Sequence, residues 1–148
     1  MPVNPALTDR AFPATGSYLV GREKVREFAR AVFSTNPLNF SVEAAQAAGY
    51  ADVVAPPTFA IVVQELTLSQ LLAEEDAGIE LTHVVHGEQR FDHSRPIVAG
   101  DELTAQLRVT SIKTLGGNAM VVAETSITDA AGEHVATAVS TLVVRGDA

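Results

Sequence analysis

The side chains that could move a proton or bind a metal are few in this sequence. It contains four histidines, His83, His86, His93 and His134, and no cysteine. His83 and His86 are three residues apart, which places them on opposite faces of a strand and makes them a poor metal pair. We expect His83, His93 and His134 to be surface residues of strands or loops. His86 lies near the end of an expected strand, and we assign it a substrate-lining rather than a catalytic role.

The charged residues on either side of Pro96 form no known catalytic motif. Asp101 follows Gly100 just before an expected strand, a position where a carboxylate commonly accepts backbone N–H bonds of a turn. Arg95 could neutralise a phosphate, but a lone arginine in a turn is more often a solvated charge. The sequence has no phosphate-binding glycine loop, no G-x-S-x-G and no H-E-x-x-H. We therefore expect neither a metal nor a cofactor.

The bulk properties indicate one globular domain over residues 1–148. The chain is 47% hydrophobic and 19% charged, and its net charge is −8. An acidic chain is a poor partner for nucleic acid or an anionic membrane. No signal peptide is visible, and no apolar run approaches the roughly 20 residues that span a bilayer. Together with the absence of cysteine, these features favour a cytoplasmic protein.

The stretch from Ala55 to Gly78 predicts one long helix around which the other elements must be arranged. Its first turns, residues 59–63, are apolar on every side, and a helix of that kind is buried. From Gln64 onward leucines are set among polar residues, which is typical of a helix with one face in solvent. Thr58 is the expected N-cap and Gly78 the expected stop. About 17 helical residues would span roughly 25 Å, the width of a small domain.

The rest of the chain predicts short elements before this helix and strands after it. Residues 1–15 contain three prolines and are interpreted as an N-terminal arm. A short strand and two short helices are expected at residues 16–20, 22–33 and 42–48. Runs rich in Val, Thr, Leu and Ile with partial alternation predict strands at residues 79–91, 102–112, 119–128 and 134–145. The short gaps between the last three strands predict antiparallel hairpins.

This order of elements indicates an α+β protein in which an antiparallel sheet wraps around one long central helix. The sheet has one face to bury, and the helix has an apolar surface to cover. That arrangement is the hotdog fold. Valine and leucine on the outer face of the sheet would indicate a partner subunit.

Three segments of the sequence resemble known hotdog proteins. Residues 91–103, FDHSRPIVAGDEL, resemble the F-x-x-x-x-P-hydrophobic-x-x-G-D-x-L signature of MaoC-like proteins. Residues 22–29 and 49–59 are similar to the branch named for the dehydratase domain of type I fatty acid synthase. That branch includes the HadA-type subunits of (3R)-hydroxyacyl-carrier-protein dehydratases. The resemblance covers the chain from about Tyr18 onward.

The catalytic stretch of that family, D-x-N-P-hydrophobic-H, is only partly present. Residues 34–39 read STNPLN, so the central N-P-hydrophobic motif agrees. Ser34 replaces the aspartate, however, and Asn39 replaces the histidine. Hydration of an enoyl thioester needs groups that titrate near the working pH, and serine and asparagine do not. We therefore expect no catalytic residue in this chain.

The resemblance also implies which residues line a substrate pocket. In hotdog enzymes the N-terminus of the central helix can stabilise the thioester oxygen through backbone N–H groups. Pro56 and Pro57 lack that donor, which weakens this function here. We expect the following side chains to contact substrate without performing chemistry: Ser34, Asn39, Pro57, Thr58, Phe59 and His86.

The function that the resemblance implies is a subunit of a (3R)-hydroxyacyl-thioester dehydratase of fatty-acid metabolism. The subunit would bind acyl-CoA or acyl-ACP, and a MaoC-like partner would supply Asp and His. One alternative is a homodimeric acyl-thioester-binding protein without catalysis. Another is an independent hydratase with His86 or Glu88 as base, and a fourth is a soluble hotdog dimer of other function. Acyl chain length, carrier and partner identity stay open at this point.

Overall fold

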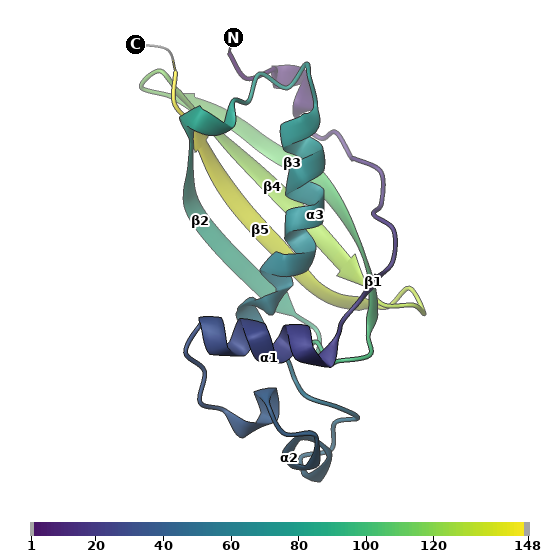
Figure 1. The fold of residues 1–148 in the computed structure, drawn as a ribbon. Helices are drawn as coiled ribbons and strands as arrows, with labels where there is room; N and C mark the ends of the chain where they lie inside the picture. Colours follow the sequence, from purple (N-terminus) through teal and green to yellow (C-terminus); the bar gives the residue numbers. More distant parts are fainter. Residues whose placement is uncertain (1, 147–148) are drawn as a thin grey trace.

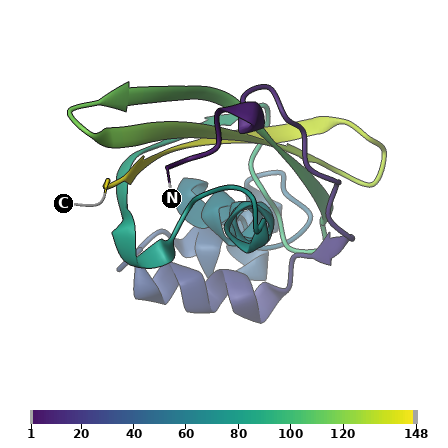
Figure 2. The same cartoon turned by 90° about the horizontal axis from the view of Figure 1, so that it is seen from above.

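The protein folds as a curved antiparallel sheet that wraps around one long helix (Figures 1 and 2). The computed structural model describes residues 2–146. The sheet has five strands in the order β1-β3-β4-β5-β2. The strands are β1 (Tyr18–Leu19), β2 (Val84–His93), β3 (Glu102–Leu115), β4 (Asn118–Thr128) and β5 (His134–Val144). The helices are α1 (Arg22–Ala31), α2 (Val42–Ala47) and α3 (Ala60–Ala73). The predicted α+β hotdog fold is confirmed.

The central helix α3 begins and ends differently from the prediction. Residues Pro57–Phe59 form a 3₁₀ turn that leads directly into α3, and the N-cap residue, Phe59, makes no side-chain capping bond. Thr58 lies inside that turn and so is not the N-cap. The helix ends at Ala73 rather than near Gly78. The acidic run that follows, residues 74–76, would be unfavourable at the negative end of a longer helix.

The face that α3 turns toward the sheet is partly polar. Ala60, Gln64, Thr67 and Leu71 are spaced three or four residues apart and are fully buried, so the helical period places them on one face. Leu66, expected in the apolar stripe, is 41% exposed on the opposite side. The polar residues Gln64 and Thr67 are therefore on the buried face of the helix, although polar residues in this stretch indicated a solvent-facing side.

Two further elements depart from the sequence expectation. Residues Leu81–His83 form a 3₁₀ turn, so β2 starts at Val84, later than predicted. The N-terminal arm is docked rather than free, because Leu7 and Phe12 are buried. The arm runs beside β3, where the Phe12 N–H donates to the Leu107 carbonyl at 2.9 Å. It therefore covers the part of the β3 edge that β1 leaves unpaired.

Candidate functional site

The candidate site is a cavity of about 530 Å³ beside the 3₁₀ turn that precedes α3. It lies where the loop between α1 and α2, the segment before α3 and the turn after β2 meet. Twelve residues line it: Ser34, Asn36, Asn39, Val54, Ala55, Pro56, Pro57, His93, Ser94, Arg95, Pro96 and Ile97. Of these, only His93 and Arg95 are ionisable.

Backbone hydrogen bonds hold the walls of this cavity together. The segment around Val54 lies between two others: the Val54 N–H donates to the Leu38 carbonyl at 2.8 Å, and the Ala55 N–H to the Ile97 carbonyl at 2.8 Å. Val54 also forms an isolated antiparallel bridge with Val98. Three segments distant in the sequence are thereby fixed side by side, so the cavity has a preformed shape.

The two positions that differ from the family motif bond to each other. The Ser34 hydroxyl donates to Asn39 Oδ1, and Asn39 Nδ2 donates to the Val54 carbonyl at 2.7 Å. Asn39 is only 4% exposed. Both ends of its amide are therefore occupied by the protein, and the pair fastens the 34–39 loop to the next wall of the cavity.

The structure brings together only half of the residues predicted to contact substrate. Ser34, Asn39 and Pro57 line the cavity, whereas Thr58 is exposed outside it. Phe59 is fully buried in the core, edge-to-face against Phe28 with ring centroids 5.4 Å apart.

His86 is not part of the cavity either. It lies on the exposed edge strand β2, where its ring bonds to Gln89 at 2.9 Å. Its substrate-lining role and that of Phe59 have no geometric support in this cavity.

Of the twelve lining residues, sequence reasoning predicted only Ser34, Asn39 and Pro57; those that it missed include His93, Ser94 and Arg95. His93 was expected at the surface, but the end of β2 turns it toward the cavity, and it is partly buried. Burial lowers the pKa of His93, against an opposing effect of the nearby Asp92 carboxylate. Ser94 hydrogen-bonds to Nδ1 of His134. The only sequence signal was that these residues directly precede Pro96 within the motif of residues 91–103.

Arg95 is a structural cation rather than the solvated charge expected from the sequence. Its guanidinium donates to both carboxylate oxygens of Asp101, at 2.8 and 3.2 Å, and to Asp129 at 3.3 Å. The Asp101 carboxylate also accepts the Val98 N–H at 2.9 Å, as expected for turn chemistry. Two carboxylates thus neutralise the one cation that faces the cavity.

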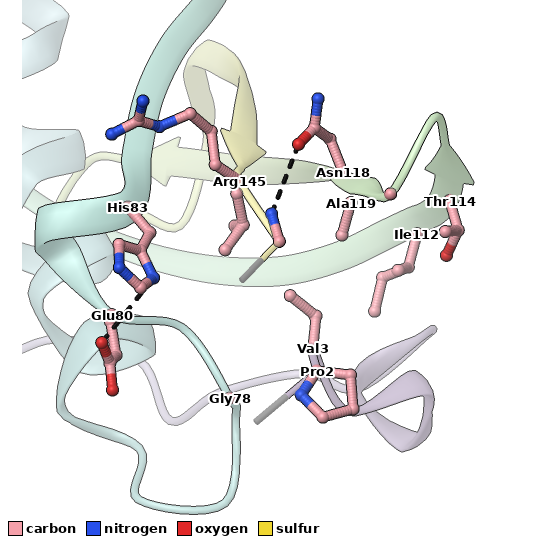
Figure 3. Close-up of a pocket in the computed structure, with 13 residues that line it drawn as sticks. Pro2, Val3, Gly78, Glu80, His83, Ile112, Thr114, Asn118, Ala119 and Arg145 are labelled. Atoms are coloured by element: carbon pink, nitrogen blue, oxygen red, sulfur yellow. Dashed lines mark hydrogen bonds and ion pairs between the residues drawn. The ribbon is translucent and has the colours of Figure 1, made fainter. Parts of the chain in front are cut away.

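A second cavity, of about 350 Å³, lies at the opposite end of α3 (Figure 3). Pro2 and Val3 of the N-terminal arm border it, together with the β3–β4 hairpin and the segment after α3. Glu80 and His83 also line it, with Nδ1 of His83 3.7 Å from a carboxylate oxygen of Glu80. None of the predicted substrate-contacting residues lies there.

Two structural features of residues 2–146 bear on the site. No group of three or more His, Cys, Asp or Glu side chains in that range is arranged to hold a metal ion. Within the same residues, none of the helices has the length and apolar character required to cross a membrane.

The curved sheet, the central helix and the cavity at its start define a hotdog protein of the dehydratase type. The family described as "FAS1-like, dehydratase domain region" matches residues 6–138, and the chain belongs to that family. A UPF0336 protein of Leifsonia xyli subsp. xyli is 65% identical over 147 residues, which are 99% of each chain.

Two solved structures are similar over nearly the whole chain. The first is from the HadBC (3R-hydroxyacyl-ACP dehydratase) complex of Mycobacterium tuberculosis, at 35% identity and a TM-score of 0.85, and covers 93% of this chain and 96% of the other. The second is a MaoC-like dehydratase at 36% identity and a TM-score of 0.85. The match covers 95% of this chain but only 43% of that one. The resemblance to MaoC-like proteins is therefore confirmed.

Proposed function

We propose that this chain is the acyl-thioester-binding subunit of a (3R)-hydroxyacyl-thioester dehydratase and that a MaoC-like partner supplies the catalytic Asp and His. One observation carries the proposal. The two positions that would hold the dyad, Ser34 and Asn39, are bonded to each other and to the backbone of Val54. The cavity is kept, but the groups that would perform chemistry in it are replaced by a structural contact.

The remaining side chains of the cavity do not replace that dyad. Dehydration removes a proton from C2 of a 3-hydroxyacyl thioester and delivers one to the departing hydroxyl at C3. Transfers of this kind require groups whose pKa lies near the working pH. No carboxylate lines the cavity, and Arg95 is already paired with two of them. His93 is the only other ionisable lining residue; burial lowers its pKa, and it has no acidic partner among the lining residues.

The composition of the cavity suits an acyl thioester. Val54, Ala55 and Ile97 give it an apolar wall, and Ser34 and Asn36 give it polar groups. Binding sites for small molecules commonly combine a mainly apolar surface with a few polar groups that fix orientation. The cavity therefore fits an apolar chain that ends in a polar thioester.

The solved relatives support a partner. The HadBC protein is named as a complex. The MaoC-like dehydratase is more than twice as long as the stretch this chain matches, which leaves room for a second domain in the same polypeptide. A dyad supplied from such a second unit is consistent with the loss of the dyad here. The alternative is a homodimer that binds acyl thioesters without catalysis.

A hydration assay with defined subunits tests the proposal. The purified chain alone should not hydrate crotonyl-CoA or longer enoyl-CoA. Co-expression with a MaoC-like protein that carries D-x-N-P-hydrophobic-H should yield a stable complex with activity. The partner alone is the control. Full activity of the isolated chain would contradict the proposal, and binding of acyl-CoA without any stable partner would favour the homodimer.

A further inference from the structure

Phe33, directly after α1, combines two unfavourable features. Its side chain is 90% exposed, the most exposed of the large hydrophobic residues in the described part of the chain. Its backbone has φ 60, in the left-handed region that favours glycine. A large aromatic residue in that conformation is a rare outlier, and such outliers concentrate where binding or switching requires them.

The position of Phe33 is fixed rather than loose. Its N–H donates to the Arg30 carbonyl at 3.0 Å, and the next N–H, of Ser34, donates to the Ala29 carbonyl at 2.9 Å. These bonds close the end of α1 in the manner of a helix-terminating motif that normally uses glycine. The ring is therefore presented to solvent from a rigid support, immediately before a residue that lines the cavity.

The surroundings of Phe33 have the composition of a protein-binding hot spot. Val32 is 44% exposed beside it. Arg30, one turn earlier, has no ion pair among the described residues, whereas Arg22, Lys24 and Arg26 of the same helix are all paired. Aromatic residues and arginine are enriched in protein interfaces, where a few residues contribute most of the binding energy.

The place of Phe33 in the fold also points to a second chain. The C-terminal end of α1 lies on the side of the sheet formed by β2 (Figures 1 and 2). Within residues 2–146, β2 pairs only with β5, so its other edge is unpaired along the ten residues of the strand. An open edge of that length is a template for another strand.

We propose that Phe33, together with Arg30, is the anchor through which this chain holds its catalytic MaoC-like partner at the mouth of the cavity. The inference rests on the proposed function. On the partner, the matching surface has an apolar hollow that receives the ring of Phe33 and a carboxylate that lies near Arg30. Because Ser34 follows Phe33 and lines the cavity, a partner seated there is next to the site that lacks its dyad.

The substitution Phe33→Gly should raise the stability of the isolated chain and lower its affinity for the partner. Glycine accepts φ 60 without strain, so the isolated chain should unfold at a higher temperature than the wild type. Removal of the ring should weaken binding of the dyad-bearing MaoC-like protein by about 30-fold or more, the effect of a hot-spot residue. Leu115→Ala is the matched control, because Leu115 is 69% exposed on the distant β3–β4 hairpin. Its partner affinity should match that of the wild type.

Three results would count against the anchor. Wild-type affinity of Phe33→Gly for the partner would overturn it and leave the proposed function intact. Weaker binding of acyl-CoA to the isolated variant, with unchanged partner affinity, would also overturn it and assign Phe33 to the ligand. Failure of the wild-type chain to bind any dyad-bearing MaoC-like protein would overturn the proposed function and this inference with it.

Discussion

Asn39, which stands where the resemblance implies a catalytic histidine, uses both ends of its amide for structure. Its oxygen accepts from Ser34 and its nitrogen donates to Val54. An amide held in this way cannot turn to a substrate without breaking a buried hydrogen bond. The sequence identified the two altered positions, but not the bond between them, because that bond depends on the 3₁₀ turn at Pro37–Asn39.

Replacement of Asn39 by alanine should therefore destabilise the chain. The change leaves the buried Val54 carbonyl without its donor, which costs about 1–3 kcal/mol. Urea unfolding followed by circular dichroism measures this free energy. Gln46→Ala is the control, because Gln46 is exposed and bonds only to the Ala51 carbonyl. A smaller loss for Asn39→Ala than for Gln46→Ala would show that the contact is not structural.

His93 predicts a pH dependence of stability. Burial lowers its pKa in the folded chain below the usual 6.5, so the unfolded chain takes up a proton first as the pH falls. Stability contributed by neutral His93 is fully present above pH 6.5 and decreases as the pH falls through the lowered folded-state pKa. His93→Gln should show a weaker loss of unfolding free energy between pH 7.5 and 5. Parallel profiles for the two proteins would contradict the assignment.

At the scale of elements, a buried polar network joins α3 to the sheet. Gln64 Nε2 donates to the Ala138 carbonyl at 3.2 Å and to Ser140 Oγ at 2.9 Å, and its oxygen accepts from Gln89 at 2.9 Å. Thr67 bonds to Thr125 at 2.8 Å. These contacts fix the rotation of the helix against β4, β5 and β2. They also satisfy polar groups that would otherwise be costly to bury.

Gln64→Leu should destabilise the protein even though it makes the core more apolar. The substitution removes the hydrogen bonds of Gln64 to the Ala138 carbonyl, Ser140 and Gln89, and loss of a partner by a buried polar group costs about 1–3 kcal/mol. Ser69→Ala on the exposed face of α3 is the control and should change stability by less than about 0.5 kcal/mol. Chemical denaturation measures both. An unchanged or higher stability of Gln64→Leu would show that the network does not stabilise the fold.

The N-terminal arm depends on close contact with Gly78. This residue has φ 72, and a Cβ added there would lie 2.1 Å from the Pro2 carbonyl oxygen. Gly78→Ala should therefore displace the arm and cost about 1–3 kcal/mol. Limited proteolysis should release the arm of this variant faster than that of the wild type. Gly16→Ala, with no atom within 4 Å of its added Cβ, should leave the arm protected. Equal protection of both variants would contradict this packing.

The sequence predicted elements better than their contacts. Glycine breaks and alternating strands located the sheet, and the apolar run before Gln64 located the central helix. Which face of that helix is turned toward the sheet was not predictable, because Gln64 and Thr67 are polar yet share the sheet-facing side with Leu71. The docked arm was missed for a related reason: Leu7 and Phe12 carry no periodic pattern and are buried only by tertiary contacts.

At the scale of the whole molecule, the chain has a formed cavity that is lined by Ser34 and Asn39 and by no carboxylate. The cavity walls are fixed by backbone bonds that do not require a ligand. One side of the molecule combines the open edge of β2 with the exposed ring of Phe33. A partner on that side would complete both the sheet and the site. The chain would then bind and orient the acyl group while the second chain moves the protons.

The central claim is tested most directly by kcat for enoyl-CoA hydration in a reconstituted complex whose MaoC-like partner has lost its dyad histidine. If the reactive half of the site belongs to the partner, replacing that histidine with asparagine should lower kcat by about 10²–10⁴-fold. Ser34→Ala in this chain should leave kcat nearly unchanged. Retention of the full rate after loss of the partner's histidine would contradict the account, because the reaction would then depend on groups of this chain.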